Sequence, residues 1–298
     1  MTLCTPTQLY LQRLAPSGRS AMISQLNQVR KILKWKGDVE TQPFHLLEYA
    51  DIEHVKQSMI QTKAPRTINL ALCALKGIIK VGFLMELTNE KQWLKVQAIK
   101  LLKTTPSSRG MALTSIDVQS LLLDCAIDQR PIGLRDSAIL ATFLSTGLRR
   151  FELANVTLND FDKQSHSIKI RAGKGRKTRV QFLPDWTLPH LNKWLAFRGN
   201  EQGFLFNPFR QKMPNTAHQL SASTIYRIVK KRTAIALEKS SSPHDLRRSF
   251  ITQLLRQNVD LSTTSKLAGH ASLATTQIYD LRDEEFARDA ALSLSFKK

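Results

Sequence analysis

Apolar residues recur at helical spacing through the first third of the chain. Between Met22 and Leu33 they lie three or four residues apart, and Ser17 and Ser20 are candidate caps for this helix. The same spacing predicts helices over residues 44–60, 65–84 and 93–102, the second of which opens with Pro65. Glycine and proline are scarce in the later part of this region, so residues 1–103 are predicted to form a compact all-helical domain.

The periodicity breaks over residues 104–112, a polar segment with Pro106 and Gly110 that is typical of an interdomain linker. A second domain, residues 113–298, is predicted to begin after it. Its first helix has Thr114 as its cap and runs through Leu123. A buried helix over residues 136–145 follows and ends at a glycine.

A β-hairpin is predicted over residues 161–184, where apolar and polar residues alternate on two strands. Ile168 and Ile170 mark the first strand, Val180 and Phe182 the second, and a glycine-rich basic turn joins them. Helices are predicted again over residues 189–197, 223–237, 245–255, 261–267 and 283–293. The predicted fold class is therefore mainly α with a small antiparallel β-sheet.

The net charge of the chain indicates the kind of partner that it binds. The 298 residues include 44 Lys and Arg against 24 Asp and Glu, giving a net charge of +20 and a pI of about 10.2. An excess of this size, spread along the chain, favours a polyanionic partner such as nucleic acid. A basic surface kept for solubility and an anionic membrane surface are the alternatives.

Several classes of protein are not indicated. Cys4, Cys73 and Cys125 are far apart and form no zinc or disulfide pattern, which fits a reducing compartment. No signal-peptide pattern opens the chain, and no apolar run approaches the ~18 residues that span a bilayer. No nucleotide-binding glycine motif is present. We expect a cytoplasmic protein without membrane attachment.

Nucleophilic attack on a phosphodiester requires cations for the non-bridging oxygens, a nucleophile, and a proton for the leaving oxygen. The second domain carries candidate residues for each of these roles. Arg149 follows Gly147 at a predicted helix end, and Arg247 lies one helical turn after His244. Each arginine can offer a planar guanidinium to phosphate. The two arginines are therefore candidate phosphate ligands.

Lys174, in a Gly-Lys-Gly turn, is a candidate general acid, and Tyr279, nine residues after His270, is a candidate nucleophile. Each motif alone is more often structural. The His-x-x-Arg pair occurs on many helix surfaces, the turn is ordinary hairpin chemistry, and a lone tyrosine is commonly a core aromatic. Their succession within one domain, at turns and helix ends, favours a shared site.

Taken together, these motifs resemble the tyrosine recombinase (phage integrase) family, in particular its short two-domain Xer-like members. The resemblance is carried by residues 146–153, 173–175, 242–250 and 267–270 together with Tyr279. It covers nearly the whole chain. It implies a helical N-terminal core-binding domain and an α+β catalytic domain that close as a clamp around DNA.

The resemblance also implies a role for each residue. The catalytic set would be Arg149, Lys174, His244, Arg247, His270 and Tyr279. The arginines and His270 would bind the scissile phosphate, the lysine would protonate the leaving 5′-oxygen, and Glu152 would orient Arg149. His244 would act as acid or base for Tyr279, which forms a 3′-phosphotyrosyl link. Because that link keeps the phosphoester energy, neither a metal ion nor a cofactor is expected.

Double-stranded DNA with specific recombination sites is the partner that the resemblance implies. Four protomers would exchange strands through a Holliday junction, for integration and excision or for resolution. DNA contacts are expected from Arg66, Lys76, Lys80, Arg176 and Lys177. The apolar tail after the tyrosine would dock on the next protomer or pack on its own domain. An accessory protein or a second recombinase would be a further partner, and the site of action would be the bacterial nucleoid.

Two other functions fit the same residues: a DNA-binding protein that has kept the fold without turnover, and a type IB topoisomerase that relaxes DNA. Two positions depart from the family pattern. Arg248 stands where many relatives have histidine, and Ala268 lies inside the Leu-Gly-His type of motif. Neither departure removes a catalytic group, so an active recombinase is expected.

Overall fold

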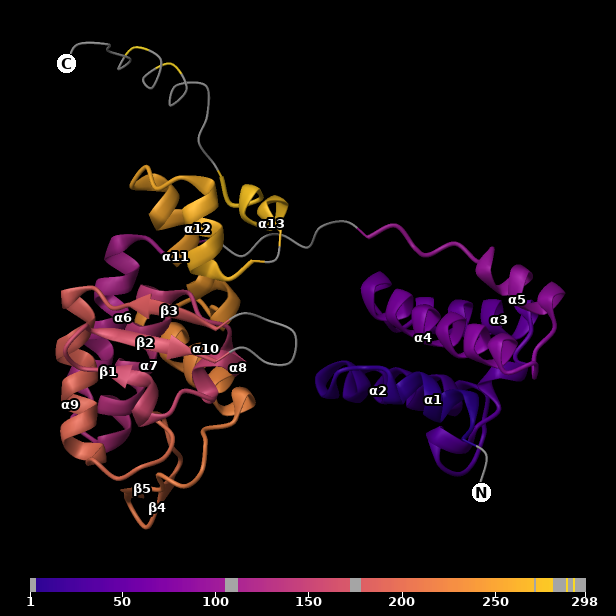
Figure 1. The fold of residues 1–298 in the computed structure, drawn as a ribbon, viewed down its shortest axis with the longest axis horizontal. Helices are drawn as coiled ribbons and strands as arrows, with labels where there is room; N and C mark the ends of the chain where they lie inside the picture. The colour runs from indigo at the N-terminus through magenta and orange to yellow at the C-terminus, as the bar shows by residue number, and fades with distance from the viewer. Residues whose placement is uncertain are drawn as a thin grey trace. The chain divides into compact units, whose positions relative to one another are not determined.

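The computed structural model describes residues 4–104, 112–171, 178–270 and 272–280, together with Arg288 and Leu292. The chain divides into two compact units, Met1–Ser108 and Arg109–Lys298 (Figure 1). The division falls within the segment that the sequence assigns to a linker, residues 104–112. Most of that segment lies outside the described residues.

The N-terminal unit is helical and is built around one long helix. Its helices are α1 (Pro6–Gln12), α2 (Pro16–Ile32), α3 (Tyr49–Ile60), α4 (Pro65–Leu84) and α5 (Glu90–Gln97), with the short 3-10 helices η1 (Val39–Thr41) and η2 (Phe44–Leu46) between α2 and α3 (Figure 1). Helix α4 packs against the other four and has nine buried residues. Phe44, Ile52 and Leu75 belong to the same core. Burial of apolar surface therefore holds this unit together.

The predicted helices of this unit are present, with corrections at their ends. Helix α2 opens with Pro16 after Ala15, so the expected capping by Ser17 or Ser20 is wrong, because both serines lie inside the helix. The helix predicted over residues 44–60 starts only at Tyr49, and the one predicted over 93–102 is shorter and starts earlier, as α5. Helix α1 is too short to show a period and was not predicted.

Helix α4 alone among the described helices is long and apolar enough to cross a membrane by length and composition. The sequence predicted that no segment would be apolar over the length of a bilayer, and α4 is an exception to that prediction. Its apolar residues form the core of the unit, however, with Ile68 and Leu72 each 1% exposed and Leu75 fully buried. Packing inside the protein accounts for the composition of this helix.

The C-terminal unit is assembled around α7 (Pro131–Thr146), in which nearly every residue is buried. This helix packs against α6 (Ser115–Ile127), α9 (Leu188–Arg198) and α11 (Pro243–Arg256), while α10 (Ala222–Leu237) packs on α6 (Figure 1). Thr114 caps α6 as predicted, through a capping box with Asp117. The main core of the unit lies between these helices and the sheet.

The predicted hairpin is part of a three-stranded antiparallel sheet in the order β1-β2-β3. Its strands are β1 (Phe161–Asp162), β2 (Ser167–Ile170) and β3 (Arg179–Phe182). The register pairs Ile168 with Gln181, which is 1% exposed, whereas Val180 and Phe182 are 47% and 66% exposed. The inner face of β3 is thus its polar face.

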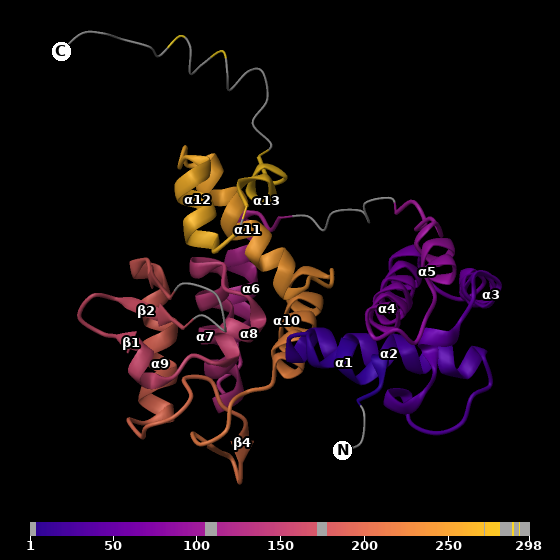
Figure 2. The same cartoon turned by 45° about the vertical axis from the view of Figure 1, so that its right-hand side comes forward.

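The remaining elements are short. They comprise α8 (Arg150–Ala154), η3 (Leu158–Asp160), η4 (Asp185–Thr187), β4 (Phe209–Arg210), β5 (Met213–Pro214), α12 (Leu261–Ala268) and α13 (Leu273–Gln277). Helices α12 and α13 lie beside α11 in both views (Figure 1 and Figure 2). Phe250, Leu255 and Tyr279 belong to a second, smaller core there. The helix predicted over residues 283–293 lies outside the described residues, apart from two positions. The fold class, mainly α with small antiparallel sheets, is confirmed.

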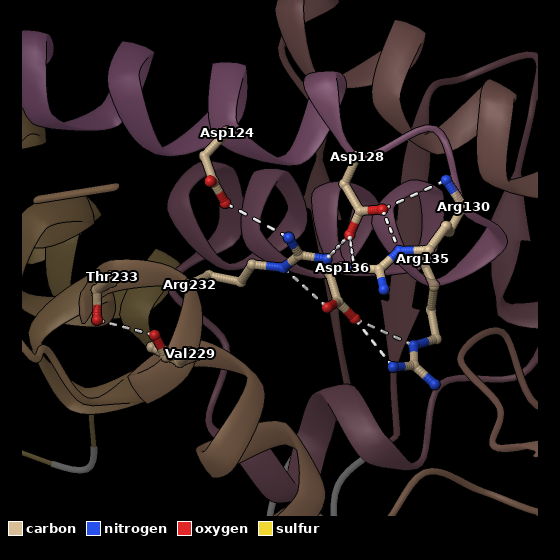
Figure 3. A network of polar contacts seen from close by, with 8 residues as sticks. All are labelled: Asp124, Asp128, Arg130, Arg135, Asp136, Val229, Arg232 and Thr233. Carbon is tan, nitrogen blue, oxygen red and sulfur yellow. Dashed lines mark hydrogen bonds and ion pairs between the residues drawn. The ribbon is translucent and has the colours of Figure 1, made fainter. Parts of the chain in front are cut away.

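A buried ion network joins three of these helices (Figure 3). Arg232 of α10 lies 3.4 Å from a carboxylate oxygen of Asp124, 2.8 Å from one of Asp128 and 3.0 Å from one of Asp136. Arg130, exposed at the edge, donates two hydrogen bonds to Asp128 at 2.7 and 3.0 Å. These bonds from Arg130, followed by those from Arg232, hold the pKa of Asp128 well below its usual range. The network therefore fixes α10 against α6 and α7.

Candidate active site

Arg149 is fixed at the start of α8 by the turn that ends α7. Gly147 has a left-handed backbone with φ of 59°, and a Cβ there would lie 2.3 Å from the ring of Phe250. The backbone N–H of Arg149 donates to Oε2 of Glu152 at 2.8 Å, and its Nη1 donates to Oε1 at 3.2 Å. Its Nη2 donates to the carbonyl of Gly269 at 2.8 Å. One carboxylate thus orients both ends of this arginine.

The second arginine, Arg247, is buried on the face of α11 that also carries His244. Its Nη1 donates to the carbonyl of Gly147 at 2.6 Å. Its Nη2 is buried and has no hydrogen-bond partner among the described residues. Burial above all, and then the charge of Arg149, lower the pKa of Arg247 to about 10. A buried guanidinium with an unused donor offers a place for an oxyanion.

Tyr279 lies in the same chain as these arginines and close to them. Tyr279 is 8% exposed, and its Oη lies 3.3 Å from Nε2 of His244. The ring stacks on that of His270 with centroids 6.2 Å apart, and the guanidinium carbon of Arg248 lies 5.3 Å from its centroid. The ring of Tyr279 is therefore packed by His270 and Arg248, and its hydroxyl faces His244.

Both histidines near Tyr279 favour the neutral form. Partial desolvation, and then the charge of Arg248, lower the pKa of His244. Desolvation, and then Arg247, lower the pKa of His270 to about 4. The Nδ1 of His270 also shares a hydrogen bond of 2.8 Å with Oγ1 of Thr276. A neutral imidazole beside a phenol can accept its proton.

A cavity of about 390 Å³ opens between these groups. Arg149, His244, Arg247, His270 and Tyr279 all line it, so five of the expected catalytic residues meet at one place. The sixth, Lys174, lies outside the described residues, as do Arg176 and Lys177. Two guanidinium groups, two imidazoles and a phenol around one cavity are suited to nucleophilic attack on a phosphodiester.

The DNA contacts expected on α4 differ in their surroundings. Arg66 and Lys80 are exposed. The Nζ of Lys76 instead donates to the carbonyls of Gln97 and Ile99 at 2.9 and 2.6 Å, at the end of α5. Lys76 therefore has a structural partner inside its own unit.

The sequence did not single out Arg179 of β3. Its Nη1 and Nη2 donate to the two carboxylate oxygens of Glu152 at 3.1 and 2.9 Å. Its guanidinium also lies against Gly269, where a Cβ would be 2.8 Å from Cζ. The signal that could have located it is the hairpin register, which pairs Arg179 with buried Ile170 and so places both on the inner face.

In the described part of the chain, no group of three or more His, Cys, Asp and Glu side chains could hold a metal ion. The described site is made of arginine, histidine, glutamate and tyrosine side chains. The guanidinium groups of Arg149, Arg150 and Arg247 line the cavity, and those of Arg179 and Arg248 act on its histidines from nearby.

Comparison with known proteins decides the family. Residues 112–285 match the phage integrase family, which is more than half of the chain. The chain belongs to the phage integrase family. Membership identifies it as a tyrosine recombinase, so the family and enzyme class predicted from the motifs are confirmed.

Relatives of known name agree. The tyrosine recombinase XerA of Pyrococcus furiosus is 34% identical over 214 residues, which cover 72% of this chain and 69% of the relative. The tyrosine recombinase XerC of Alcanivorax borkumensis is 28% identical over 278 residues, which cover 91% of this chain and 87% of the relative. The similarity to Xer recombinases therefore extends over most of this chain.

Solved structures share the fold. A crystal structure of XerA recombinase superposes with a TM-score of 0.53 at 22% identity, covering 98% of this chain and 99% of that one. A lambda integrase dimer bound to a core site gives a TM-score of 0.70 at 16% identity, covering 100% and 99%. A XerH recombinase bound to its difH substrate before cleavage gives 0.66 at 19% identity, covering 97% and 84%.

Proposed function

We propose that this recombinase cuts and rejoins double-stranded DNA at specific sites, with Tyr279 as the nucleophile. The observation that carries the proposal is the approach of its Oη to 3.3 Å from Nε2 of His244, in a cavity also lined by Arg247, whose buried Nη2 has no hydrogen-bond partner among the described residues. DNA as the substrate is supported by the basic charge of the chain and by structural neighbours solved on DNA.

The scissile phosphate would occupy the cavity between the two arginines. Nη2 of Arg247 would donate to one non-bridging oxygen, and Arg149 would neutralise the other. The ring nitrogen of His270 that does not meet Thr276 would complete the set. Buried cations stabilise the extra charge of the pentacoordinate transition state more strongly than water does.

The chemical steps balance without an external reagent. Oη of Tyr279 attacks phosphorus and passes its proton to Nε2 of His244, and the bond from phosphorus to the 5′-oxygen breaks. We assign Lys174 as the donor of the proton that the leaving oxygen takes up. A 5′-hydroxyl of the partner duplex then attacks the 3′-phosphotyrosyl link and gives its proton to Lys174, while His244 returns its proton to the departing phenol oxygen. The phosphoester bond count is unchanged, so no energy source is consumed.

The organisation around this site is also part of the proposal. Residues 1–103 would bind DNA as the core-binding domain, 104–112 would link the domains, and 113–298 would form the catalytic domain. Four protomers would assemble on synapsed DNA through the C-terminal tail, with an accessory protein or a second recombinase as a further partner. The expected place of action is the cytoplasm, at the bacterial nucleoid.

A suicide-substrate assay tests the proposal. Sites bound by the protein are mapped by footprinting, and a nicked duplex that loses its 5′-hydroxyl fragment on cleavage is made from them. The wild type is expected to form a covalent adduct that resists denaturant, and Tyr279→Phe is expected to form none. Tyr10→Phe removes the hydroxyl of a partly buried tyrosine that packs against the core of the N-terminal unit, and it serves as the matched control.

The products distinguish the recombinase from the alternatives. Joined strands from two duplexes establish recombination, whereas relaxation of a supercoiled plasmid without joined products would point to a topoisomerase. Absence of any adduct with every bound DNA would leave a DNA-binding protein without turnover and would refute the proposal.

A further inference from the structure

Glu152 is shared by two arginines that come from distant parts of the chain. Its carboxylate accepts from the backbone N–H and Nη1 of Arg149 and from Nη1 and Nη2 of Arg179. The pair with Arg179 is bidentate, and the two side chains are 19% and 14% exposed. Bidentate arginine–carboxylate pairs with little solvent contact fix geometry as well as charge.

The sharing of this carboxylate affects the charge that reaches the cavity. Burial alone would raise the pKa of Glu152, but the hydrogen bonds from Arg179, followed by that from the Arg149 backbone, lower it, so the carboxylate is ionised. Paired with Arg149 alone, it would neutralise the guanidinium meant for the phosphate. With Arg179 as a second partner, the cluster of two guanidinium groups and one carboxylate keeps a net positive charge.

The inner face of β3 also holds the segment that carries His270. The guanidinium of Arg179 occupies the space beside Gly269, whose carbonyl accepts from Nη2 of Arg149 at 2.8 Å. Two residues further along β3, the side-chain amide of Gln181 donates to the carbonyl of Leu267. The strand therefore connects the start of α8 with the end of α12.

We propose that Arg179 is a positioning residue for strand cleavage, which acts by holding Glu152 and Gly269 so that Arg149 faces the scissile phosphate. Arg179 does not line the cavity, whereas Arg149 does. Its effect therefore passes through Arg149 and not through the DNA. This inference rests on the proposed function, because it assumes that Arg149 binds the phosphate.

The first test compares Arg179→Ala with Arg171→Ala in the suicide-substrate assay. Arg171 also pairs with a buried carboxylate near the sheet, its Nε lying 2.7 Å from Oδ1 of Asp160, so the two changes remove the same charge and each breaks an ion pair, although Arg171 is 67% exposed and makes a single contact. Arg179→Ala is expected to slow adduct formation about 100-fold, because a misplacement of about 1 Å costs on that order. Arg171→Ala is expected to keep the wild-type rate, and Arg179→Lys, which cannot bind bidentately, should fall between them.

The second test separates positioning from general damage. A methylphosphonate at the scissile position replaces one charged oxygen with methyl and so reduces the need for a guanidinium. If Arg179 acts through Arg149, the defects of Arg179→Ala and Arg149→Ala will both shrink on this substrate. A misfolded variant would lose the same factor on both substrates, and thermal unfolding of each variant is measured alongside.

The outcomes are distinct. Wild-type adducts that vanish in Tyr279→Phe establish the proposed function before the arginine variants are compared. Given those adducts, a rate for Arg179→Ala equal to that of Arg171→Ala overturns the inference. So does an equal loss on phosphodiester and methylphosphonate, which would mean that Arg179 supports the fold only.

Discussion

At the scale of single residues, the site concentrates positive charge that the fold only partly compensates. Arg149 and Arg179 share Glu152, and Arg247 donates to one carbonyl and has a buried Nη2 that meets no acceptor in the part of the chain that the structure describes. Burying these charges is costly in the absence of an anion. The lowered pKa values of Arg247 and His270 are of the kind that clusters at functional sites. The uncompensated charge is what a phosphodiester would satisfy.

The same charge makes His270 sensitive to acid. Its pKa is about 4 in the folded protein against the ordinary value of 6.5, so the unfolded chain takes up the proton first. The stability that neutral His270 contributes is complete above about pH 6.5 and is lost as pH falls toward about 4. We expect the melting temperature of the wild type to fall more between about pH 7 and about pH 5 than that of His270→Gln.

Differential scanning calorimetry at both pH values measures this effect, with His218→Gln as the control because His218 is exposed. Equal acid sensitivity of the wild type and His270→Gln would contradict the expectation.

Most residues of the candidate site could be predicted from the sequence because they stand in short motifs. Arg149, His244, Arg247 and Tyr279 were chosen from spacing and from the family resemblance, and they meet at one cavity. Arg179 was not found, because its role depends on strand register. An alternating strand with apolar residues suggests an apolar inner face, and only pairing with β2 shows that the polar face points inward.

At the scale of elements, the turn between α7 and α8 carries Arg149 and contacts Arg247 of α11. The backbone of Gly147 is left-handed, its carbonyl accepts from Arg247, and its Cα lies against Phe250. Gly147→Ala is expected to lower the free energy of unfolding by about 1–2 kcal/mol for the backbone alone. It should also slow adduct formation, because Phe250 and Arg247 must move.

Gly199→Ala is the control for this prediction. Gly199 also has a positive φ, of 82°, but a Cβ there would meet nothing within 4 Å. Chemical denaturation should show a loss of stability for both variants, and the adduct assay a loss of rate for Gly147→Ala only. A normal rate in Gly147→Ala would mean that the turn does not position the arginines.

Long elements were predictable and short ones were not. Helices α4, α7, α10 and α11 repeat their apolar spacing over several turns, which a single sequence reveals. Helices α8 and α13 and the β4–β5 pair are too short to establish any period. The start of α2 was misplaced because proline at the first helical position, and not a serine cap, begins that helix.

The ion network of Figure 3 predicts a large effect from one side chain. Arg232→Met would leave the carboxylates of Asp124, Asp128 and Asp136 without their shared cation. Breaking a buried pair in this way costs about 3–5 kcal/mol. Urea denaturation should detect that loss, whereas Arg130→Ala, at the exposed edge of the same network, should lower the free energy of unfolding by much less. A similar loss of unfolding free energy in the two variants would contradict the expectation that the buried arginine contributes more than the exposed one.

At the scale of the whole molecule, the net charge of +20 predicts how DNA binding responds to salt. If about 6–10 phosphates are contacted, affinity should fall roughly 10³–10⁵-fold between about 50 and 200 mM salt. Lys80→Ala should reduce the slope of log affinity against log salt by about one. Lys76→Ala should leave it unchanged, because that ammonium is bound to carbonyls of α5.

Fluorescence anisotropy titrations over a salt series measure the slopes. A reduced slope in Lys76→Ala would show that its ammonium leaves those carbonyls when DNA binds.

The placement of Tyr279 in the small core of its own chain has a consequence for inheritance. If Tyr279 is the nucleophile and Arg149 and Arg247 bind the phosphate, each copy carries these groups itself and needs no neighbour to supply them. After gene duplication, two such copies could diverge in the sequences they prefer and still work side by side on one junction, each responsible for a different strand. A nucleophile borrowed from a neighbour would tie the two lineages together.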